Sequence, residues 1–144
     1  MEKYLFRGKR IDNYNYEWVE GQLLTIPVDK SKEDYQYFII TEVDFRDSIY
    51  DVHRYAYEVD PKTVSQFTGL TDKNDKKIFK GDIVLYNGTN VGVVDFADGS
   101  FGVRFGDGTS AMFLCFAAEH SVVIGNIYDD QELCKVYNLF IMCS

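Results

Sequence analysis

The feature that most constrains this chain is a series of short apolar segments between residues 81 and 128, separated by turn-forming pairs. The segments GDIVLY, VGVVDF, FGVRF, TSAMFLCF and SVVIGNIY are rich in β-branched and aromatic residues, as strands are. Asn87-Gly88, Asp98-Gly99 and Asp107-Gly108 separate the first four, and these pairs tolerate the positive φ angles that tight hairpin turns need. The pattern predicts a five-stranded antiparallel meander.

The last two of these segments need a cover on both sides. Ala111–Phe116 and Val122–Ile124 are apolar on both faces, so their outer side must be covered by the rest of the chain or by a partner. Short strands, tight turns and a one-turn break before the last strand favour a small barrel, because closing a sheet removes its aggregation-prone edges. We therefore expect a mainly β chain with a five-stranded SH3-like barrel, or pseudobarrel, over residues 81–128.

Residues 1–60 predict a second β-rich region. KYLFRGKR and YEWVEGQLLTI predict a hairpin joined by the turn IDNYN. YQYFIITEV and HRYAYEV predict two more strands by their β-branched and aromatic content, after a polar loop from Pro27 to Asp34.

One or two short helices are predicted around the barrel. Asp60-Pro61 has the residue types of an N-cap and first helical position, and predicts a helix of at most two turns that ends by Gly69. Asp129 or Asp130 is predicted to cap another short helix over QELCKVY. The expected organisation is an N-terminal β-rich, tyrosine-rich subdomain (1–60), a helix-and-turn connector (61–80), the barrel (81–128) and a C-terminal helix or tail (129–144).

The charge distribution disfavours nucleic acid as a partner. The chain has a formal net charge of −8, whereas proteins that bind phosphate backbones carry clustered Lys and Arg. Only the connector is net basic, through Lys62, Lys73, Lys76, Lys77 and Lys80. A solvated turn explains these lysines more simply than a nucleic-acid site does.

The residues of common catalytic and metal sites are sparse. Three cysteines with no CxxC spacing predict neither a disulfide framework nor a zinc knuckle, and they fit a reducing cytoplasm. Cys115 lies in an apolar run and is interpreted as a buried structural residue, not as the nucleophile of a dyad with His120. Asp98 and Asp107 are explained by their turns and not by a metal. We expect no enzymatic activity, no cofactor and no metal.

No segment is suited to a membrane. No run approaches the roughly 20 apolar residues of a membrane-spanning helix, and the N-terminus MEKYLFRGKR has no apolar signal core. A cytoplasmic protein with no membrane partner is expected.

The aromatic residues suggest one candidate binding patch. Eight of the 11 tyrosines lie in residues 1–60, and tyrosine suits half-wet surfaces and interfaces. Tyr14, Tyr16 and Trp18 cluster around the first predicted hairpin and could form a binding or self-association patch. The alternative is that Trp18 packs inward beneath the barrel.

Three separated blocks, FRGKRID (Phe6–Asp12), QFTGLTDKNDKKIFKGDIV (Gln66–Val84) and VIGNIYDD (Val123–Asp130), resemble the YopX family of phage and prophage proteins. The resemblance covers roughly residues 5–132. The chain departs from the family pattern at Asn74-Asp75, where Asn-Gly is expected, although Asp can occupy that turn position. The resemblance implies a small, mostly β, phage-encoded protein and implies no catalytic activity.

These observations favour a noncatalytic accessory protein that binds a protein partner or another copy of itself, and in the second case it would form a homo-oligomer. One alternative is an acidic decoy whose carboxylates replace phosphates in the nucleic-acid site of a host protein. Another is a weak nucleic-acid-binding module that uses Lys62–Lys80 with stacked tyrosines. An enzyme with an unrecognised site ranks last.

Overall fold

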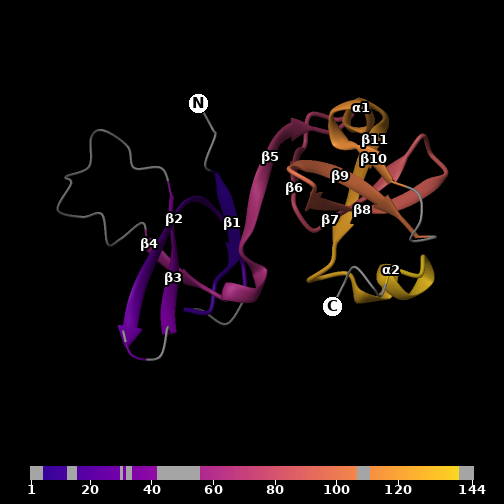
Figure 1. Cartoon of the computed structure of the whole chain (residues 1–144). Coiled ribbons are helices and arrows are strands. Elements are labelled where there is room, and N and C mark those ends of the chain that lie inside the picture. The colour runs from indigo at the N-terminus through magenta and orange to yellow at the C-terminus, as the bar shows by residue number, and fades with distance from the viewer. Residues whose placement is uncertain are drawn as a thin grey trace. The chain divides into compact units, whose positions relative to one another are not determined.

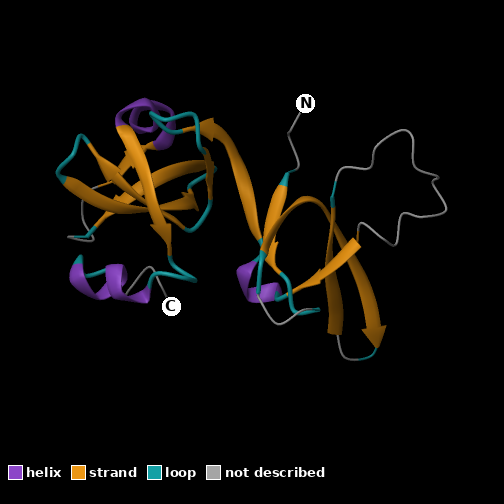
Figure 2. Cartoon of the chain, turned by 180° about the vertical axis from the view of Figure 1, so that it is seen from behind, coloured by secondary structure: helices purple, strands orange, loops and turns teal. Residues whose placement is uncertain are grey.

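The computed structural model describes residues 5–12, 16–29, 31, 34–41, 56–106 and 111–139. Strands dominate it and helices are short, which confirms the expectation of a mainly β chain (Figure 1, Figure 2). The chain divides into two compact units, Met1–Gln66 and Phe67–Ser144. Within the described ranges, no helix has both the length and the apolar character that crossing a bilayer requires.

The first unit contains strands β1 to β4 and the first two residues of β5, which belong to a six-stranded antiparallel sheet of order β4-β3-β2-β1-β5-β6, in which β6 is Lys77–Phe79. These strands are β1 (Phe6–Lys9), β2 (Trp18–Asp29), β3 (Asp34–Ile40), β4 (Ala56–Val59) and β5 (Ser65–Thr71). The predicted N-terminal hairpin is confirmed, because β1 and β2 pair with Lys9 opposite Trp18. The two further strands are also present, but β2 continues through Pro27, where the sequence predicts the start of a loop.

Close packing in this unit depends on Gly8 in β1. Ile39 and Val59 are buried in its core, and a Cβ atom on Gly8 would lie only 2.9 Å from the Val59 Cβ. The neighbouring Lys9 N–H donates to Thr63 Oγ1 at 2.9 Å. The glycine of the FRGKRID block therefore allows β1 to approach β4 closely.

The helix predicted after Asp60 is much shorter than expected. Asp60 caps it as predicted, but the 3₁₀ helix η2 spans only Pro61–Thr63. Ser65 and Phe67 are buried at alternate positions of β5, as a strand requires. The prediction of two turns up to Gly69 is wrong, because Ser65–Thr71 is extended and pairs with β1.

The second unit contains a five-stranded antiparallel sheet in the order β10-β9-β8-β7-β11. Its elements are β6 (Lys77–Phe79), β7 (Asp82–Tyr86), β8 (Asn90–Ala97), β9 (Ser100–Phe105), β10 (Ala111–Phe113), α1 (Leu114–Ala117), η3 (Ala118–His120), β11 (Ser121–Asn126) and α2 (Gln131–Val136). The Asn87-Gly88 and Asp98-Gly99 turns have positive φ at both residues, between 49° and 82°, as predicted. The Asp107-Gly108 turn lies outside the described residues.

The expected barrel is not closed. β11 pairs with β7, and β10 and β11 are the two edges of the sheet. The predicted fourth strand is also too long, because only Ala111–Phe113 is extended and the chain then turns into α1. Leu114 and Ala117 are fully buried, and their spacing of three residues puts both on one helix face. A short helix thus completes the core where the sequence predicts a continuing strand.

The five-stranded sheet has an apolar cluster on each face. On one face, α1 and η3 pack with residues of the strands, through Ile78, Val84, Val94, Val103, Leu114, Ala117 and Ala118. On the other face, α2 and the residues after it cover part of the sheet, through Ile83, Val91, Val93, Cys134 and Leu139. This second cover lies over β7 and β8, whereas β9 and β10 contribute no buried residue to it.

The turn between β5 and β6 is held by a single carboxylate. Asp72 Oδ1 accepts hydrogen bonds from the N–H groups of Asn74 and Lys76 at 2.8 and 2.9 Å. Its Oδ2 accepts from Val123 N–H of β11 at 2.9 Å. Burial by itself would raise the pKa of Asp72, but these three backbone hydrogen bonds and the charge of Lys76 outweigh it and lower the pKa.

The turn before α2 is built in a similar way. Asp130 precedes the helix as predicted but makes no side-chain cap bond, because its Oδ2 accepts from Asn126 N–H at 2.9 Å. Asn126 Oδ1 in turn accepts from the N–H groups of Tyr128 and Asp129. A Cβ atom on Gly125 would lie 2.5 Å from the Asp130 carboxylate. The VIGNIYDD block therefore comprises the end of β11 and a turn held by its own side chains, and a side chain at Gly125 would displace the Asp130 carboxylate.

Candidate binding site

The predicted tyrosine and tryptophan patch is only partly described. Tyr14 lies outside the described residues, and Tyr16 is 58% exposed. Trp18 is half-buried in the first unit, with the Arg7 guanidinium carbon 4.6 Å and the Lys9 Nζ 5.8 Å from its ring. The indole is therefore covered by two cationic side chains from the paired strand β1, a favourable cation–π arrangement.

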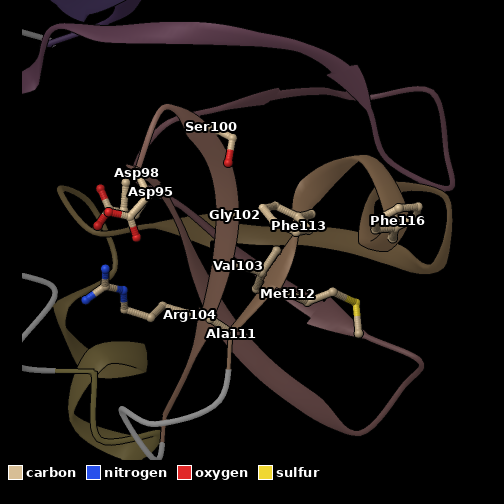
Figure 3. Close-up of a pocket in the computed structure, with 11 residues that line it drawn as sticks. Asp95, Asp98, Ser100, Gly102, Val103, Arg104, Ala111, Met112, Phe113 and Phe116 are labelled. Carbon is tan, nitrogen blue, oxygen red and sulfur yellow. The ribbon is translucent and has the colours of Figure 1, made fainter.

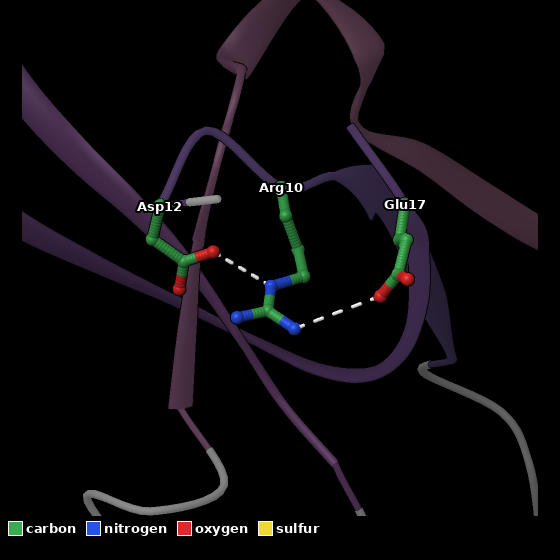
Figure 4. A network of polar contacts seen from close by, with 3 residues as sticks. All are labelled: Arg10, Asp12 and Glu17. Carbon is green, nitrogen blue, oxygen red and sulfur yellow. Dashed lines mark hydrogen bonds and ion pairs between the residues drawn. The ribbon is translucent and has the colours of Figure 1, made fainter. Parts of the chain in front are cut away.

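Arg10 forms a second polar contact network at the end of β1 (Figure 4). Its Nε lies 2.6 Å from Asp12 Oδ1, and a terminal nitrogen lies 3.8 Å from Glu17 Oε2. The hydrogen bond that Arg10 Nε–H donates to the Asp12 carboxylate is the main reason that the pKa of Arg10 is raised. The guanidinium carbon also lies 4.1 Å from the Tyr57 ring centre. The carboxylates of Asp12 and Glu17 compensate the charge of Arg10 within the unit. Through these contacts, Arg10 links the end of β1 to the residue before β2.

A groove of about 500 Å³ lies in the second unit, on β8, β9, β10 and the start of α1. Figure 3 shows Phe113 and Phe116 on one side of it and Asp95, Asp98 and Arg104 on the other. Phe113 is 59% exposed and Phe116 is 65% exposed. We define these five residues, together with Gly102, as the β10 groove.

The groove exists because β9 carries no side chain at its centre. Gly102 pairs with Asp95 of β8 on one side and with Phe113 of β10 on the other. Residues paired across an antiparallel sheet share a face, so the missing side chain leaves a hollow between the carboxylate and the ring. The neighbouring Val103 points to the opposite face and is fully buried there.

The two ends of the β10 groove differ chemically. The rings of Phe113 and Phe116 lie 6.3 Å apart at an angle of 62° and form its apolar end. At the polar end, Asp95 Oδ1 accepts from its neighbour's N–H at 2.8 Å. Arg104 forms no ion pair with any carboxylate in the described part of the chain. The groove can therefore bind an apolar side chain beside a charged one.

The cysteines lie differently from expectation. Cys115 is exposed, not buried, because it lies on the outer side of α1 while Leu114 and Ala117 face the core. His120 contacts Glu119, with Nε2 3.5 Å from Oε1. Cys134 is fully buried and disulfide-bonded, a bond that the sequence pattern does not predict.

The remaining polar candidates do not converge on a metal site. Within the described residues, no group of three His, Cys, Asp or Glu side chains could hold a metal ion. Of the candidate basic stretch, Lys62 belongs to the first unit, whereas Lys73, Lys76, Lys77 and Lys80 belong to the second. Lys73 and Lys76 lie in the turn that Asp72 holds.

The sequence analysis does not predict the apolar residues of the β10 groove as a binding site, although the apolar pattern around them gives one indication. Ala111–Phe116 is apolar at every position, which predicts an outer face in need of a cover. Phe113 and Phe116 are the large side chains of this run that the described chain leaves exposed. The three sequence blocks noted above instead contain the close-packing and turn residues Gly8, Asp72 and Gly125.

Comparison with known protein families gives a match over most of the chain. The sequence profile of the YopX protein family matches residues 5–135, which cover most of both units. No curated protein matches the chain. The β10 groove lies inside the matched region but outside the three blocks.

Proposed function

Because this chain belongs to the YopX family, we propose that it is a phage- or prophage-encoded accessory protein that acts as a noncatalytic protein-binding module. The β10 groove is its binding surface. The polar residues of the groove are the carboxylates of Asp95 and Asp98 and the guanidinium of Arg104, which are suited to ion pairs with a protein partner. A bacterial cytoplasmic location is part of the proposal.

The observation that supports this function is the pair of exposed phenylalanines beside the groove. Phe113 and Phe116 are each more than half exposed to solvent. Fully burying a phenylalanine stabilises by roughly 1.5–3 kcal/mol relative to leaving it in water. Adjacent exposed aromatic side chains next to a hollow are typical of interaction sites, since aromatic anchors carry much of the binding energy in interfaces.

A capture experiment with matched variants tests the proposal. Tagged protein is incubated with bacterial host lysate, with and without nuclease, and bound proteins are identified by mass spectrometry. We expect a stoichiometric protein partner that the double variant Phe113→Ala/Phe116→Ala loses. The control Phe96→Ala retains the partner, because Phe96 is 50% exposed but pairs with Phe101 on the other face of the sheet.

Other results would point to the other functions. A partner that both variants retain would remove the β10 groove from the proposal. Recovery that disappears with nuclease would favour nucleic-acid binding through Lys62–Lys80. A basic, DNA-handling partner released by salt would favour the acidic decoy. A concentration-dependent mass in light scattering that the double variant abolishes would favour self-assembly.

A further inference from the structure

We infer that the β10 groove receives one tryptophan side chain from the surface of a protein partner, which enters from above the sheet and not along the edge of β10. The indole lies over Gly102, between the carboxylate of Asp95 and the ring of Phe113, and its N–H donates to that carboxylate. This inference rests on the proposed protein-binding function and specifies the residue that anchors the partner.

The first support is the row of residues that forms the floor and the two sides of the groove. Asp95, Gly102 and Phe113 lie directly opposite one another on β8, β9 and β10, so their positions share one face of the sheet. Neighbouring strands are about 4.8 Å apart, so Asp95 and Phe113 stand about 10 Å apart with only a glycine between them. This spacing leaves room for one side chain inserted from above.

The second support is that the floor of the groove is open. Among the described residues, a Cβ atom on Gly102 would meet only the Met112 carbonyl group, with its oxygen at 3.1 Å. The apolar cluster on this face of the sheet includes residues of β7 and β8 but none of β9 or β10. Glycine inside a strand is typical of places where another group approaches the backbone closely. The groove volume of about 500 Å³ therefore lies over exposed backbone on which a ring can rest.

The third support is the mixture of charges at the polar end, where Figure 3 shows Asp95, Asp98 and Arg104. A cationic occupant would meet the guanidinium, and an anionic occupant would meet the carboxylates. A neutral ring with one N–H donor suits both, because a carboxylate accepts the N–H and a guanidinium stacks on an aromatic face. Asp95 Oδ1 accepts from Phe96 N–H, whereas its Oδ2 makes no hydrogen bond within the described residues. An acceptor for the indole is therefore available.

The fourth support is the aromatic wall of the groove. Phe113 and Phe116 are each more than half exposed, and their ring centres lie 6.3 Å apart. A further ring packs against such a pair edge-to-face or offset. Tryptophan is enriched at the anchor positions of interfaces, and its indole N–H is a donor that needs an acceptor when it is buried. The Asp95 carboxylate meets that need, which a phenylalanine side chain does not have.

The probe is N-acetyl-tryptophanamide, an uncharged tryptophan with both ends blocked, which is titrated to about 10 mM into the intact, ¹⁵N-labelled protein. We expect saturable movement of the Gly102 and Phe113 amide signals, with a dissociation constant of about 1 mM. The same probe methylated on the indole nitrogen lacks the N–H and should bind at least threefold more weakly. The corresponding phenylalanine, tyrosine and lysine probes should also bind at least threefold more weakly.

Two groove variants and one control locate the probe. Asp95→Asn keeps an oxygen for Phe96 N–H and replaces the other with an amide nitrogen that cannot accept. We expect it to weaken the tryptophan probe at least threefold and to leave the methylated probe unchanged. Gly102→Val fills the hollow, so the Phe113 signal should no longer move. Phe96→Ala, on the opposite face, binds like the parent.

Thermal unfolding verifies that each variant is folded, and the contrast between the two indole probes on Asp95→Asn needs no result from Gly102→Val. The inference is overturned if the signals do not move, or if the methylated or lysine probe binds as tightly as the tryptophan probe. Tighter binding of the tyrosine or phenylalanine probe overturns it as well. So does unchanged binding of the tryptophan probe by a folded Asp95→Asn or Gly102→Val variant.

The capture experiment separates this failure from failure of the proposed function. If Phe113→Ala/Phe116→Ala loses the lysate partner while the tryptophan probe fails, the groove is a protein-binding surface whose anchor is a different side chain. In that case the proposed function stands and this inference falls.

Discussion

Replacing Asp72 by asparagine is the sharpest test of how the second unit is held together. Asp72 is only 5% exposed, and its carboxylate accepts three backbone hydrogen bonds. Asparagine keeps one oxygen, which can still accept from Asn74 and Lys76. Its other atom is an amide nitrogen, which faces Val123 N–H as donor against donor.

The expected loss follows from this geometry. A buried donor left without a partner costs about 1–3 kcal/mol, so Asp72→Asn should lower the free energy of unfolding by about 2 kcal/mol. Asp72→Ala removes both acceptor oxygens and with them all three hydrogen bonds, and water can replace the acceptor at the exposed Asn74 and Lys76. We therefore expect a loss of about 3 kcal/mol for alanine. Urea denaturation by circular dichroism measures both, with hydrogen exchange of the Val123 amide as the local readout.

The pH dependence gives an independent measurement. The folded pKa of Asp72 is lowered, so its carboxylate stabilises the fold above the unfolded pKa of about 3.9. This stabilisation is lost as the pH falls through the lower, folded pKa. The difference in free energy of unfolding between the parent protein and Asp72→Asn should be largest at pH 7 and should decrease below about pH 4.

The control is Asp98→Asn, the same chemical change at an exposed turn residue with a φ of 54°. Asparagine tolerates this conformation, so the free energy of unfolding should stay within about 0.5 kcal/mol of the parent value. The reasoning is refuted if Asp72→Asn also changes stability by less than about 0.5 kcal/mol at pH 7. A difference that grows as the pH falls would refute it as well.

The remaining predictions concern backbone conformation and accessibility. Asp75 has a φ of 65°, so Asp75→Gly should stabilise by about 1 kcal/mol in urea denaturation, and a loss of stability would contradict this. A Cβ atom on Gly21 would collide with the Ile40 carbonyl oxygen, so Gly21→Ala should lower the melting temperature and cost about 1–3 kcal/mol; an unchanged melting temperature would show that the strands can separate freely. Native protein treated with iodoacetamide should be alkylated at the exposed Cys115 but not at the buried, bonded Cys134, as peptide mass spectrometry would show; equal labelling would exclude the described placement.

Local patterns predicted much of the fold because the forces behind them act over a few residues. The turns at Asn87-Gly88 and Asp98-Gly99 follow from the φ angles that these residue types tolerate. Asp60 caps η2 through its own side chain. The β1–β2 hairpin follows from strand-forming residues on both sides of a polar turn.

Local patterns failed where a distant partner decides the outcome. The apolar run Ala111–Phe116 reads equally well as a strand or as a buried helix, and the core selects a helix by burying Leu114 and Ala117. The same selection puts Cys115 on the surface. The sequence leaves two interpretations of Trp18, a surface patch or a position beneath the barrel, and the structure adds that the cross-strand cations Arg7 and Lys9 lie over its ring.

The sequence by itself determined the β-rich composition, the turn positions, most strands and the family blocks, since each depends on residue type and short-range spacing. Only the tertiary structure decided that β11 pairs with β7, that the sheet stays open at β10, and that Gly102 creates a hollow beside Phe113. These features depend on contacts between residues far apart in the chain. Many pairings satisfy the same pattern of apolar residues, and three-dimensional packing selects one of them.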